Sequence, residues 1–401
     1  MRLFHRHVVA SRASADPRKG STMPPQEPDQ QPAGSDHYVE LEELRPGEFV
    51  VWATTHAPRT RLRSVTGPPG GGKSTFLRQV ETRLLPDSRC FLLPPLKFSG
   101  SEEVTQSVQQ WMDDIGPATR RQGYHEPSVV SGSNDMKQRW IKITGQLPRI
   151  CSSRTRVLLI DGFDELPVDK RQWVEEIVIK PFLLPGHGDS GTGNRCVIAR
   201  RDEFALSEAV LRWEDDVHPL KGLARDQQTE QIERRLGVIR NRPADEARAR
   251  LEWPEANDPY VGAAEQAAIT TAVNFAVRLN EMQTRALVDL LKDFLTPNPF
   301  VNLLLLRRQF LHPVTPLNAN DCQDCLSCYV ERSRVPHMTV GEVIGLVQRL
   351  ANPASFTLRD ANNPIGNTQF QELRDAGLVT PIPGTARYRF EPAVIQLVNH
   401  I

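Results

Sequence analysis

Nine consecutive residues constrain the fold of this chain more than any other stretch. Their sequence, G-P-P-G-G-G-K-S-T at positions 67–75, contains the pattern G-x-x-x-x-G-K-S of a phosphate-binding loop. The residues before the loop, 62–66, are β-prone, and the apolar residues after it recur at helical spacing. A strand, a loop and a helix therefore follow in order, which is the context that a phosphate-binding loop requires.

The residue types in the loop suit an anion. Glycines allow backbone N–H groups to approach phosphate oxygens without an intervening Cβ, and the positive end of the following helix faces the same point. We expect Lys73 to reach the β and γ phosphates and the Ser74 hydroxyl to bind Mg²⁺. The alternative is a surface turn that contains Lys-Ser by chance. The expected nucleotide-binding residues of the loop are Gly67, Pro68, Pro69, Gly70, Gly71, Gly72, Lys73, Ser74 and Thr75.

A second motif lies at the end of an apolar run, 156–161, which reads as a buried parallel strand. Asp161 ends the run, and Asp164 and Glu165 follow it. Three acids so close together would repel one another without a counter-ion, which Mg²⁺ and phosphate would supply. A solvated acidic turn is the alternative. We expect Asp161 to bind Mg²⁺ and Asp164 or Glu165 to position or deprotonate the attacking water.

A third candidate follows another apolar run, 195–199, which ends at Arg200 and Arg201. Ligands of open α/β sheets bind at the carboxyl ends of the strands, so an arginine here could contact the γ-phosphate. The alternative is an arginine pair on the surface.

The order of these patterns predicts an α/β fold with a five-stranded, mostly parallel sheet. We also interpret 49–53 as a strand and 90–96 as one continuous strand. From residue 225 the pattern becomes helical, and the last sixty residues read as helix, helix, hairpin and helix, which is a winged-helix arrangement. The expected units are a disordered tail at 1–37, a P-loop NTPase domain at 38–223, a helical domain at 224–315 and a winged-helix domain at 316–401.

Composition restricts the partners and the compartment. Lys and Arg total 49, and Asp and Glu also total 49, so no nucleic-acid footprint covers the whole chain. No apolar run approaches the length of a membrane span, and cysteines within apolar runs read as core thiols of a cytoplasmic protein. The first twenty residues are rich in arginine, which fits a tail, a transit peptide or a chain that truly starts at Met23.

Residues 158–166, L-L-I-D-G-F-D-E-L, resemble the Walker B motif of NACHT-type STAND NTPases, signalling ATPases related to NOD-like receptors. The tiny Gly162 after Asp161 and the acids at Asp164 and Glu165 match that family's pattern. The resemblance also aligns Arg201 with the arginine that senses the γ-phosphate. It places Pro299, in an Asn-Pro-Phe sequence that opens a Leu-rich helix, near the adenine.

This resemblance implies a switch that binds ATP and Mg²⁺, hydrolyses ATP slowly and opens or oligomerises according to the nucleotide. No effector or sensor repeat is visible, so we expect such partners to act in trans, or the chain to be a fragment of a longer receptor. In the family, a histidine of the winged helix often touches the nucleotide. The aligned residues here, 390–393, include no histidine.

Three cysteines, Cys322, Cys325 and Cys328, form a C-x₂-C-x₂-C pattern that could bind Zn²⁺ with a histidine. The alternative is a loop of reduced thiols. Two other functions also remain open from the sequence. One is an AAA-type motor that remodels protein or DNA, and the other is a winged-helix DNA-binding regulator with a vestigial nucleotide pocket. The recognition-like helix at 367–376 carries more acid than base, which disfavours nucleic acid as a partner.

Overall fold

A computed structural model describes most of the chain from Pro46 onward, so the expected tail at 1–37 lies outside the described residues. Also outside them are residues 56–60, 88, 99–103, 122–134, 151–154, 185–192, 202–204, 221, 257, 260, 336, 360–363 and 383, and the side chains of 118–121 and 148–150.

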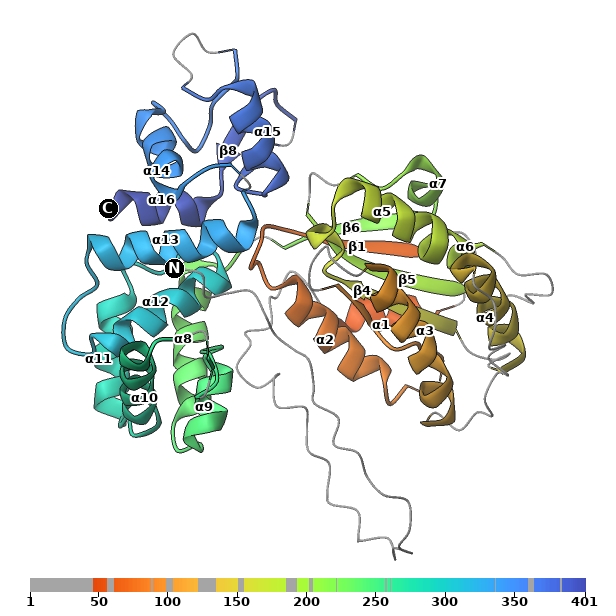
Figure 1. The fold of residues 1–401 in the computed structure, drawn as a ribbon, viewed down its shortest axis with the longest axis horizontal. Coiled ribbons are helices and arrows are strands. Elements are labelled where there is room, and N and C mark those ends of the chain that lie inside the picture. The colour runs from red at the N-terminus through yellow and green to blue at the C-terminus, as the bar shows by residue number, and fades with distance from the viewer. Residues whose placement is uncertain are drawn as a thin grey trace, which may run out of the picture.

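A parallel sheet holds the phosphate-binding loop (Figure 1). Its strand order is β2-β4-β5-β1-β6, and β3 pairs with the distal half of β4. Strand β1, which leads into the loop, therefore lies between β5 and β6 inside the sheet. The strands are β1 Leu62–Thr66, β2 Cys90–Leu92, β3 Leu96–Lys97, β4 Thr155–Asp161, β5 Asn194–Arg200 and β6 Glu214–Pro219.

The sheet differs from the prediction in two places. It has six strands rather than five, because the segment expected as one strand is divided into β2 and β3. Pro94 and Pro95 lie at the division, where each lacks the N–H that a strand needs for its ladder. The other difference is α1, Pro46–Thr54, a helix where 49–53 was predicted as a strand. Phe49, Trp52 and Ala53 are buried at helical spacing on its inner face.

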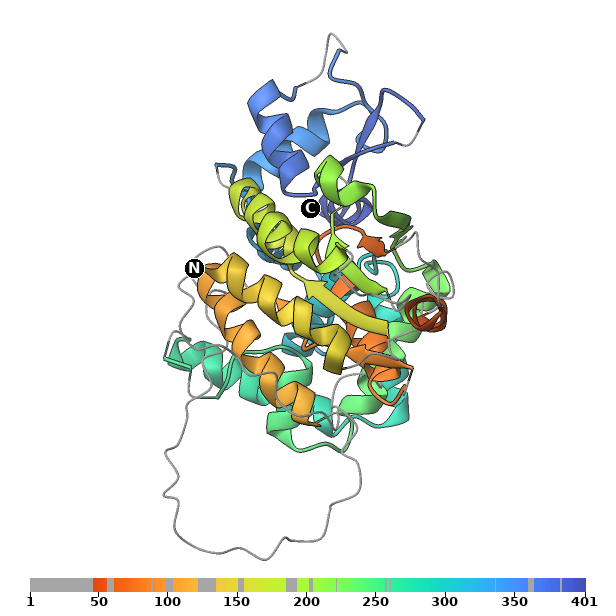
Figure 2. The ribbon, with the colours of Figure 1, turned by 90° about the vertical axis from the view of Figure 1, so that its right-hand side faces the viewer.

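Two apolar cores cover the two faces of the sheet. Successive side chains of β4 point to opposite faces of the sheet, so the strand contributes to both cores. Leu158 and Ile160 belong to one core, and Val157 and Leu159 belong to the other. Helices α1 and α2 pack on one face, and α3 to α6 cover the opposite one (Figures 1 and 2). These helices are α2 Lys73–Leu84, α3 Val104–Arg121, α4 Met136–Ile150, α5 Val168–Val174 and α6 Lys180–Leu183, with a π-helical turn at Glu175–Ile179 and α7 at Glu208–Leu211.

The remaining elements form a second, largely helical part beside the sheet (Figure 1). One continuous apolar core runs from Ile232 of α8 to Val398 of α16, across the expected boundary at 315. The elements expected for a winged helix are present in order, while the winged-helix assignment itself stays a prediction. They are α8 Arg225–Ile239, α9 Ala244–Arg250, α10 Ala263–Val277, α11 Glu281–Leu291, α12 Pro299–Leu311, α13 Ala319–Ser333, α14 Val340–Arg349, α15 Asn367–Asp375, β7 Val379–Pro381, β8 Tyr388–Phe390 and α16 Pro392–Asn399.

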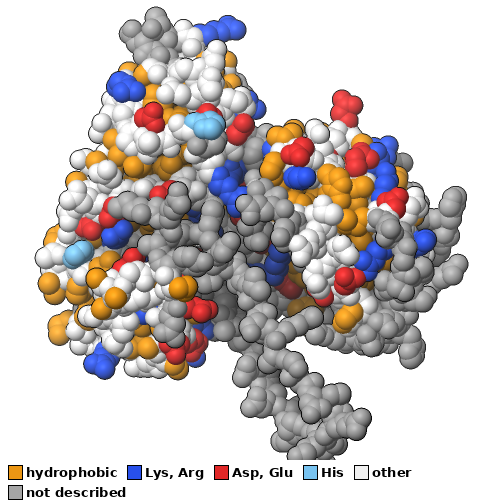
Figure 3. All heavy atoms as spheres, in the orientation of Figure 1, with side chains coloured by type: hydrophobic (Ala, Val, Ile, Leu, Met, Phe, Trp, Pro, Cys, Tyr) orange, Lys and Arg blue, Asp and Glu red, His pale blue; other side chains and the backbone are white. Residues whose placement is uncertain are grey.

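The surface shows no dominant charge on the face drawn in Figure 3, where acidic and basic side chains are interspersed with apolar ones. Within the described part of the chain, no helix combines the length and the apolar character needed to cross a membrane.

Candidate functional site

The phosphate-binding loop connects the carboxyl end of β1 to the first residue of α2, Lys73. Gly72 precedes the helix in a left-handed conformation, with φ 94°, and Gly70 has φ 70°. A Cβ at Gly70 would also lie 2.6 Å from Cβ of Phe300. The loop therefore needs glycine at these two positions for its backbone path, and at Gly70 for the close approach of α12 as well.

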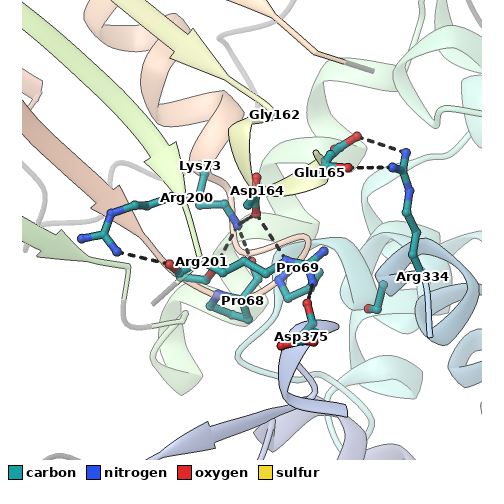
Figure 4. Close-up of polar contacts among 12 residues, drawn as sticks. Pro68, Pro69, Lys73, Gly162, Asp164, Glu165, Arg200, Arg201, Arg334 and Asp375 are labelled. Atoms are coloured by element: carbon teal, nitrogen blue, oxygen red, sulfur yellow. Dashed lines mark hydrogen bonds and ion pairs between the residues drawn. The ribbon is translucent and has the colours of Figure 1, made fainter. Parts of the chain in front are cut away.

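Lys73 is fixed by the loop that it follows. Its Nζ donates hydrogen bonds to the carbonyl oxygens of Gly67 and Pro68, each at 2.9 Å. The same Nζ lies 3.1 Å from Oδ2 of Asp164, and the Lys73 side chain is 9% exposed (Figure 4). The ammonium group is thus held between the loop and the acidic motif, where a phosphate bound by the loop would meet it.

Ser74 and Asp161 come together as the sequence predicts. Ser74 Oγ donates a hydrogen bond of 2.9 Å to Asp161 Oδ1, which also accepts from the backbone N–H of Gly162 at 3.0 Å. Burial raises the pKa of Asp161, and the nearby charge of Asp164 raises it further. A hydroxyl and a carboxylate are hard oxygen ligands of the kind that Mg²⁺ prefers, and a cation would relieve this charge crowding. The donor set fits Mg²⁺.

Gly162 is required at its position for two reasons. Its backbone is left-handed, with φ 71°, and a Cβ there would lie 2.2 Å from the carbonyl oxygen of Phe98. Phe98 follows β3, so the contact sets how closely the end of β3 approaches the acidic motif. Any side chain at Gly162 would therefore displace the turn that carries Asp164 and Glu165.

Asp164 lies in the short 3₁₀ turn Phe163–Glu165 and is buried. Its Oδ2 pairs with Lys73 Nζ and also with Nε of Arg201, at 3.4 Å. Burial disfavours the charged form, but the positive charges of Lys73 and then Arg201 outweigh it and lower the pKa of Asp164. Asp164 is thus an ionised centre that two cations share.

Arg201 follows β5 and joins this network to the C-terminal part of the chain. Its Nη1 donates a hydrogen bond of 2.6 Å to the carbonyl oxygen of Asp375, the last residue of α15 (Figure 4). The neighbouring Arg200 instead pairs with Glu214 of β6, at 3.3 Å. Both arginines are 5% exposed, which rules out the alternative of a surface pair.

Glu165 has a different environment from Asp164. Its Oε2 lies 3.4 Å from Nη2 of Arg334, and its backbone carbonyl accepts a hydrogen bond of 3.0 Å from Nη1 of the same arginine. Burial and then the charge of Asp164 raise the pKa of Glu165, while Arg334 opposes that rise. The two acids of the motif therefore differ, because Asp164 pairs with two cations that lower its pKa, whereas Glu165 has a raised pKa.

The outer side of the loop contacts the C-terminal part through one carbonyl. The oxygen of Pro69 accepts hydrogen bonds from Nδ2 of Asn298, at 2.9 Å, and from the hydroxyl of Tyr329, at 3.1 Å. Asn298 Nδ2 also lies 3.3 Å from Oε1 of Glu391, the residue before α16. Glu391 is 3% exposed, and burial raises its pKa. Two C-terminal residues, Asn298 and Tyr329, thus contact one peptide of the phosphate-binding loop, and Glu391 contacts it indirectly through Asn298.

A cavity of about 240 Å³ lies over the loop and gathers most of the predicted site residues. Gly67 and Pro68 are not in its wall, and their carbonyls instead hold Lys73. The predicted residues that line it are Pro69, Gly70, Gly71, Gly72, Lys73, Ser74, Thr75, Asp161, Asp164, Glu165, Arg201 and Pro299. Two further lining residues, Gly162 and Phe300, belong to the Walker B pattern and the Asn-Pro-Phe sequence already described. The sequence did not point to the remaining five, which are Arg78, Arg235, Glu252, Leu303 and Arg332.

The zinc prediction is not supported. Cys322, Cys325 and Cys328 lie along helix α13, so the alternative of a loop of thiols is also wrong. Burial raises the pKa of Cys322 to about 11 and that of Cys325 well above its usual range, which disfavours the thiolates that zinc requires. Among the described residues, no group of three His, Cys, Asp or Glu side chains could hold a metal ion.

Asn298, Arg334 and Glu391 also contact the site but were not predicted as site residues, and they differ in how clearly the sequence marks them. Asn298 precedes Pro299 at the start of α12 and caps it by accepting hydrogen bonds from the N–H groups of Phe300 and Val301. Asn before Pro at a helix start is a recognisable signal. Glu391 likewise precedes a proline at a helix start, and it caps α16 by accepting a hydrogen bond from the N–H of Ala393. Arg334 carries no comparable signal, because its role depends on contact with a distant segment.

Comparisons with known proteins give no family. No protein-family model matches the chain, and no curated protein matches it. Among solved structures, an ORC2 protein from Aeropyrum pernix, in ADPNP–ADP complexes, is similar with 13% identity and a TM-score of 0.40, over 91% of this chain and 97% of that chain.

Two further solved structures are similar over comparable parts of this chain. A Signal Transduction ATPase with Numerous Domains (STAND) protein with a tetratricopeptide repeat sensor, from Pyrococcus horikoshii, has 13% identity and a TM-score of 0.31, over 91% of this chain and 43% of that one. A RuvB mutant from Thermotoga maritima has 14% identity and a TM-score of 0.31, over 90% and 96%. These TM-scores lie below 0.5, so the functional argument rests on the geometry of the site.

Proposed function

We propose that this protein is an ATP-hydrolysing molecular switch of the STAND type. The observation that carries the proposal is the buried network of Lys73, Asp164 and Arg201. This network lies at a phosphate-binding loop, and a C-terminal helix holds its arginine through the carbonyl of Asp375. One of the two cations that would bind a triphosphate, Arg201, is therefore bound to the part of the chain that would have to move.

Each side chain of the site has a distinct role in this proposal. The loop N–H groups and Lys73 bind the β and γ phosphates. Ser74 and Asp161 would hold Mg²⁺, which when bound would neutralise charge on the phosphates. Arg201 contacts the γ-phosphate after leaving Asp164 or Asp375. Each of these interactions favours nucleotide binding through groups that the fold has already placed at the cavity.

The two acids divide the work between them. Asp164 is a poor base, because Lys73 and Arg201 stabilise its ionised form. Glu165 has a raised pKa and lines the cavity, so it is the better candidate for orienting and deprotonating the attacking water. We assign Asp164 to the organisation of the two cations and Glu165 to the general base.

The contacts between the two parts of the chain support a closed resting state. Pro69 contacts α12 and α13, Arg201 contacts α15, and Glu165 contacts Arg334. ADP would favour this closed arrangement, and ATP would favour one in which the C-terminal part is displaced and a surface for self-association is exposed.

In this proposal Pro299 and Phe300 lie at the nucleobase, which we expect to be adenine. Effector and sensor proteins act in trans.

An AAA-type ATPase that remodels protein or DNA would use the same P-loop chemistry. The motor and the proposed switch differ in their rate of ATP turnover, because a motor releases ADP rapidly, whereas a switch retains it. A winged-helix DNA-binding regulator would bind DNA tightly without turnover.

Steady-state ATP hydrolysis by the full chain, with and without duplex DNA, separates these three functions, and Glu165→Gln provides the control for background hydrolysis. The switch predicts slow turnover, retained ADP and no effect of DNA. Fast turnover that DNA or a protein stimulates would support the motor instead. Tight DNA binding without turnover would support the regulator.

A further inference from the structure

Arg334 ends helix α13 in an unusual conformation. Its φ and ψ are 59° and 52°, in the left-handed region, where a residue with a Cβ is disfavoured. In this position the guanidinium group reaches both the carboxylate and the backbone carbonyl of Glu165, which is 169 residues away in the sequence. The contact between these two groups therefore accompanies an unfavourable backbone conformation, as is common at functional sites.

Helix α13 also contacts the phosphate-binding loop. Tyr329, five residues before Arg334, donates its hydroxyl hydrogen bond to the carbonyl of Pro69. Between them, Arg332 lines the cavity and places its guanidinium 4.0 Å from the ring centroid of Phe300. One turn and a half of a single helix thus touches the loop, the cavity wall and the proposed general base.

We infer that Arg334 is a positioning residue that restrains Glu165, so that hydrolysis proceeds at full rate only when the end of α13 moves away. The inference rests on the proposed function, because it concerns the base of that reaction. An arginine bound to a carboxylate occupies an oxygen that water would need and makes that carboxylate a weaker base. A phosphate that shifts the Pro69 peptide would act on Arg334 through Tyr329 and the rigid helix.

The charges around Glu165 give this inference a pH signature. Asp164 and Asp161 oppose its ionisation, and Arg334 and Arg332 favour it. Removal of the guanidinium of Arg334 should therefore raise the pKa of Glu165. In a plot of hydrolysis rate against pH, the rise at acidic pH (the acidic limb) should therefore move to higher pH, and the maximal rate on the plateau should increase.

The variants can separate charge from backbone conformation. Arg334→Asn removes the charge and keeps a residue type that tolerates the left-handed region. Arg334→Lys keeps the charge and should keep the wild-type position of the acidic limb. Arg349→Gln removes an exposed arginine from α14, away from the site, and serves as the matched control.

The experiment is single-turnover hydrolysis of Mg·ATP by the full chain across a pH series. We expect Arg334→Asn to raise the plateau rate about two- to fivefold, the range that breaking a half-exposed ion pair allows. In a Glu165→Gln background the same substitution should have no further effect. A lowered plateau, an unmoved acidic limb or an undiminished effect in Glu165→Gln would overturn the inference.

Hydrogen–deuterium exchange in the nucleotide-free chain tests the restraint without any turnover. Arg334→Asn should increase exchange over 162–166 and 329–334, and Arg349→Gln should not. Unchanged exchange would overturn the inference. Increased exchange in a protein that hydrolyses no ATP would instead support the restraint and reject the proposed function, so the two failures are distinguishable.

Discussion

The ammonium nitrogen of Lys73 lies 3.1 Å from the carboxylate of Asp164, and both side chains are more than nine-tenths buried. Such a pair contributes little net stability by itself, but removal of one partner leaves a buried charge uncompensated. Here Arg201 contacts the same oxygen from another direction. Asp164 therefore keeps one positive partner if the other leaves to bind a phosphate.

Lys73→Ala should weaken nucleotide binding while the fold survives. The lost charge-assisted interaction is worth about 1.5–3 kcal/mol, which corresponds to a tenfold to hundredfold loss of affinity. Arg201 remains beside Asp164 and limits the loss of stability. Calorimetric titration with ATP measures the effect, and Lys180→Ala, which breaks an exposed pair with Glu176, is the control. Unchanged ATP affinity in Lys73→Ala would refute the assignment of the loop.

Substitution of the two acids should separate catalysis from organisation of the site. Glu165→Gln should bind ATP with near-native affinity and hydrolyse it about a hundredfold or more slowly, because it removes only the proposed base. Asp164→Asn removes the shared partner of Lys73 and Arg201, so it should lower ATP affinity and thermal stability as well. Rapid-quench kinetics and thermal unfolding measure these effects. If both variants turn over at the native rate, the acidic motif has a purely structural role.

Gly162→Ala should destabilise the protein by at least about 1–3 kcal/mol, because alanine is strained at φ 71° and its Cβ would overlap the carbonyl of Phe98. Urea unfolding measures the change. The matched control is Gly237→Ala on α8, where the added Cβ meets open space and the helix should gain about 0.5–1 kcal/mol. Equal stability of the two variants would contradict the structure of this turn.

Some of this site follows directly from local sequence, and some does not. The glycines at 70 and 72, Lys73 and the acids after β4 belong to short patterns whose geometry is set within a few residues. The contacts of Glu165 with Arg334 and of Pro69 with Tyr329 join residues 169 and 260 positions apart. No periodicity encodes such contacts, because they depend on how the helical part packs on the sheet.

The incorrect predictions of the fold have a related origin. The apolar run at 49–53 is short enough to suit either a strand or a helix, and the deciding fact is tertiary. Val51 points to solvent, at 61% exposed, while Phe49 and Trp52 pack on α2 and the sheet. Similarly, Cys322, Cys325 and Cys328 have a spacing that suits a metal loop and also suits a helix. In both cases the helix forms because its apolar side chains pack into a core, that of the sheet for 49–53 and that of the helical part for the cysteines.

The buried carboxyl of Glu391 should make stability depend on pH. Its pKa is raised above the ordinary 4.5 by burial, so the folded state binds a proton more tightly than the unfolded state. Its contribution is therefore most favourable below pH 4.5 and is lost as the pH rises through the folded pKa. Glu391→Gln should flatten the dependence of unfolding free energy on pH above 4.5. An unchanged slope, measured by urea titrations at several pH values, would contradict this role.

Nucleotide-dependent opening is the central claim, and small-angle X-ray scattering of the purified full chain tests it most directly. The profiles should be recorded with saturating Mg·ADP and with a non-hydrolysable ATP analogue, after calorimetry has shown that both bind. The account predicts a larger radius of gyration, or a dimer or higher oligomer, with the analogue, and a compact monomer with ADP. Identical monomeric profiles with the two bound nucleotides would contradict it.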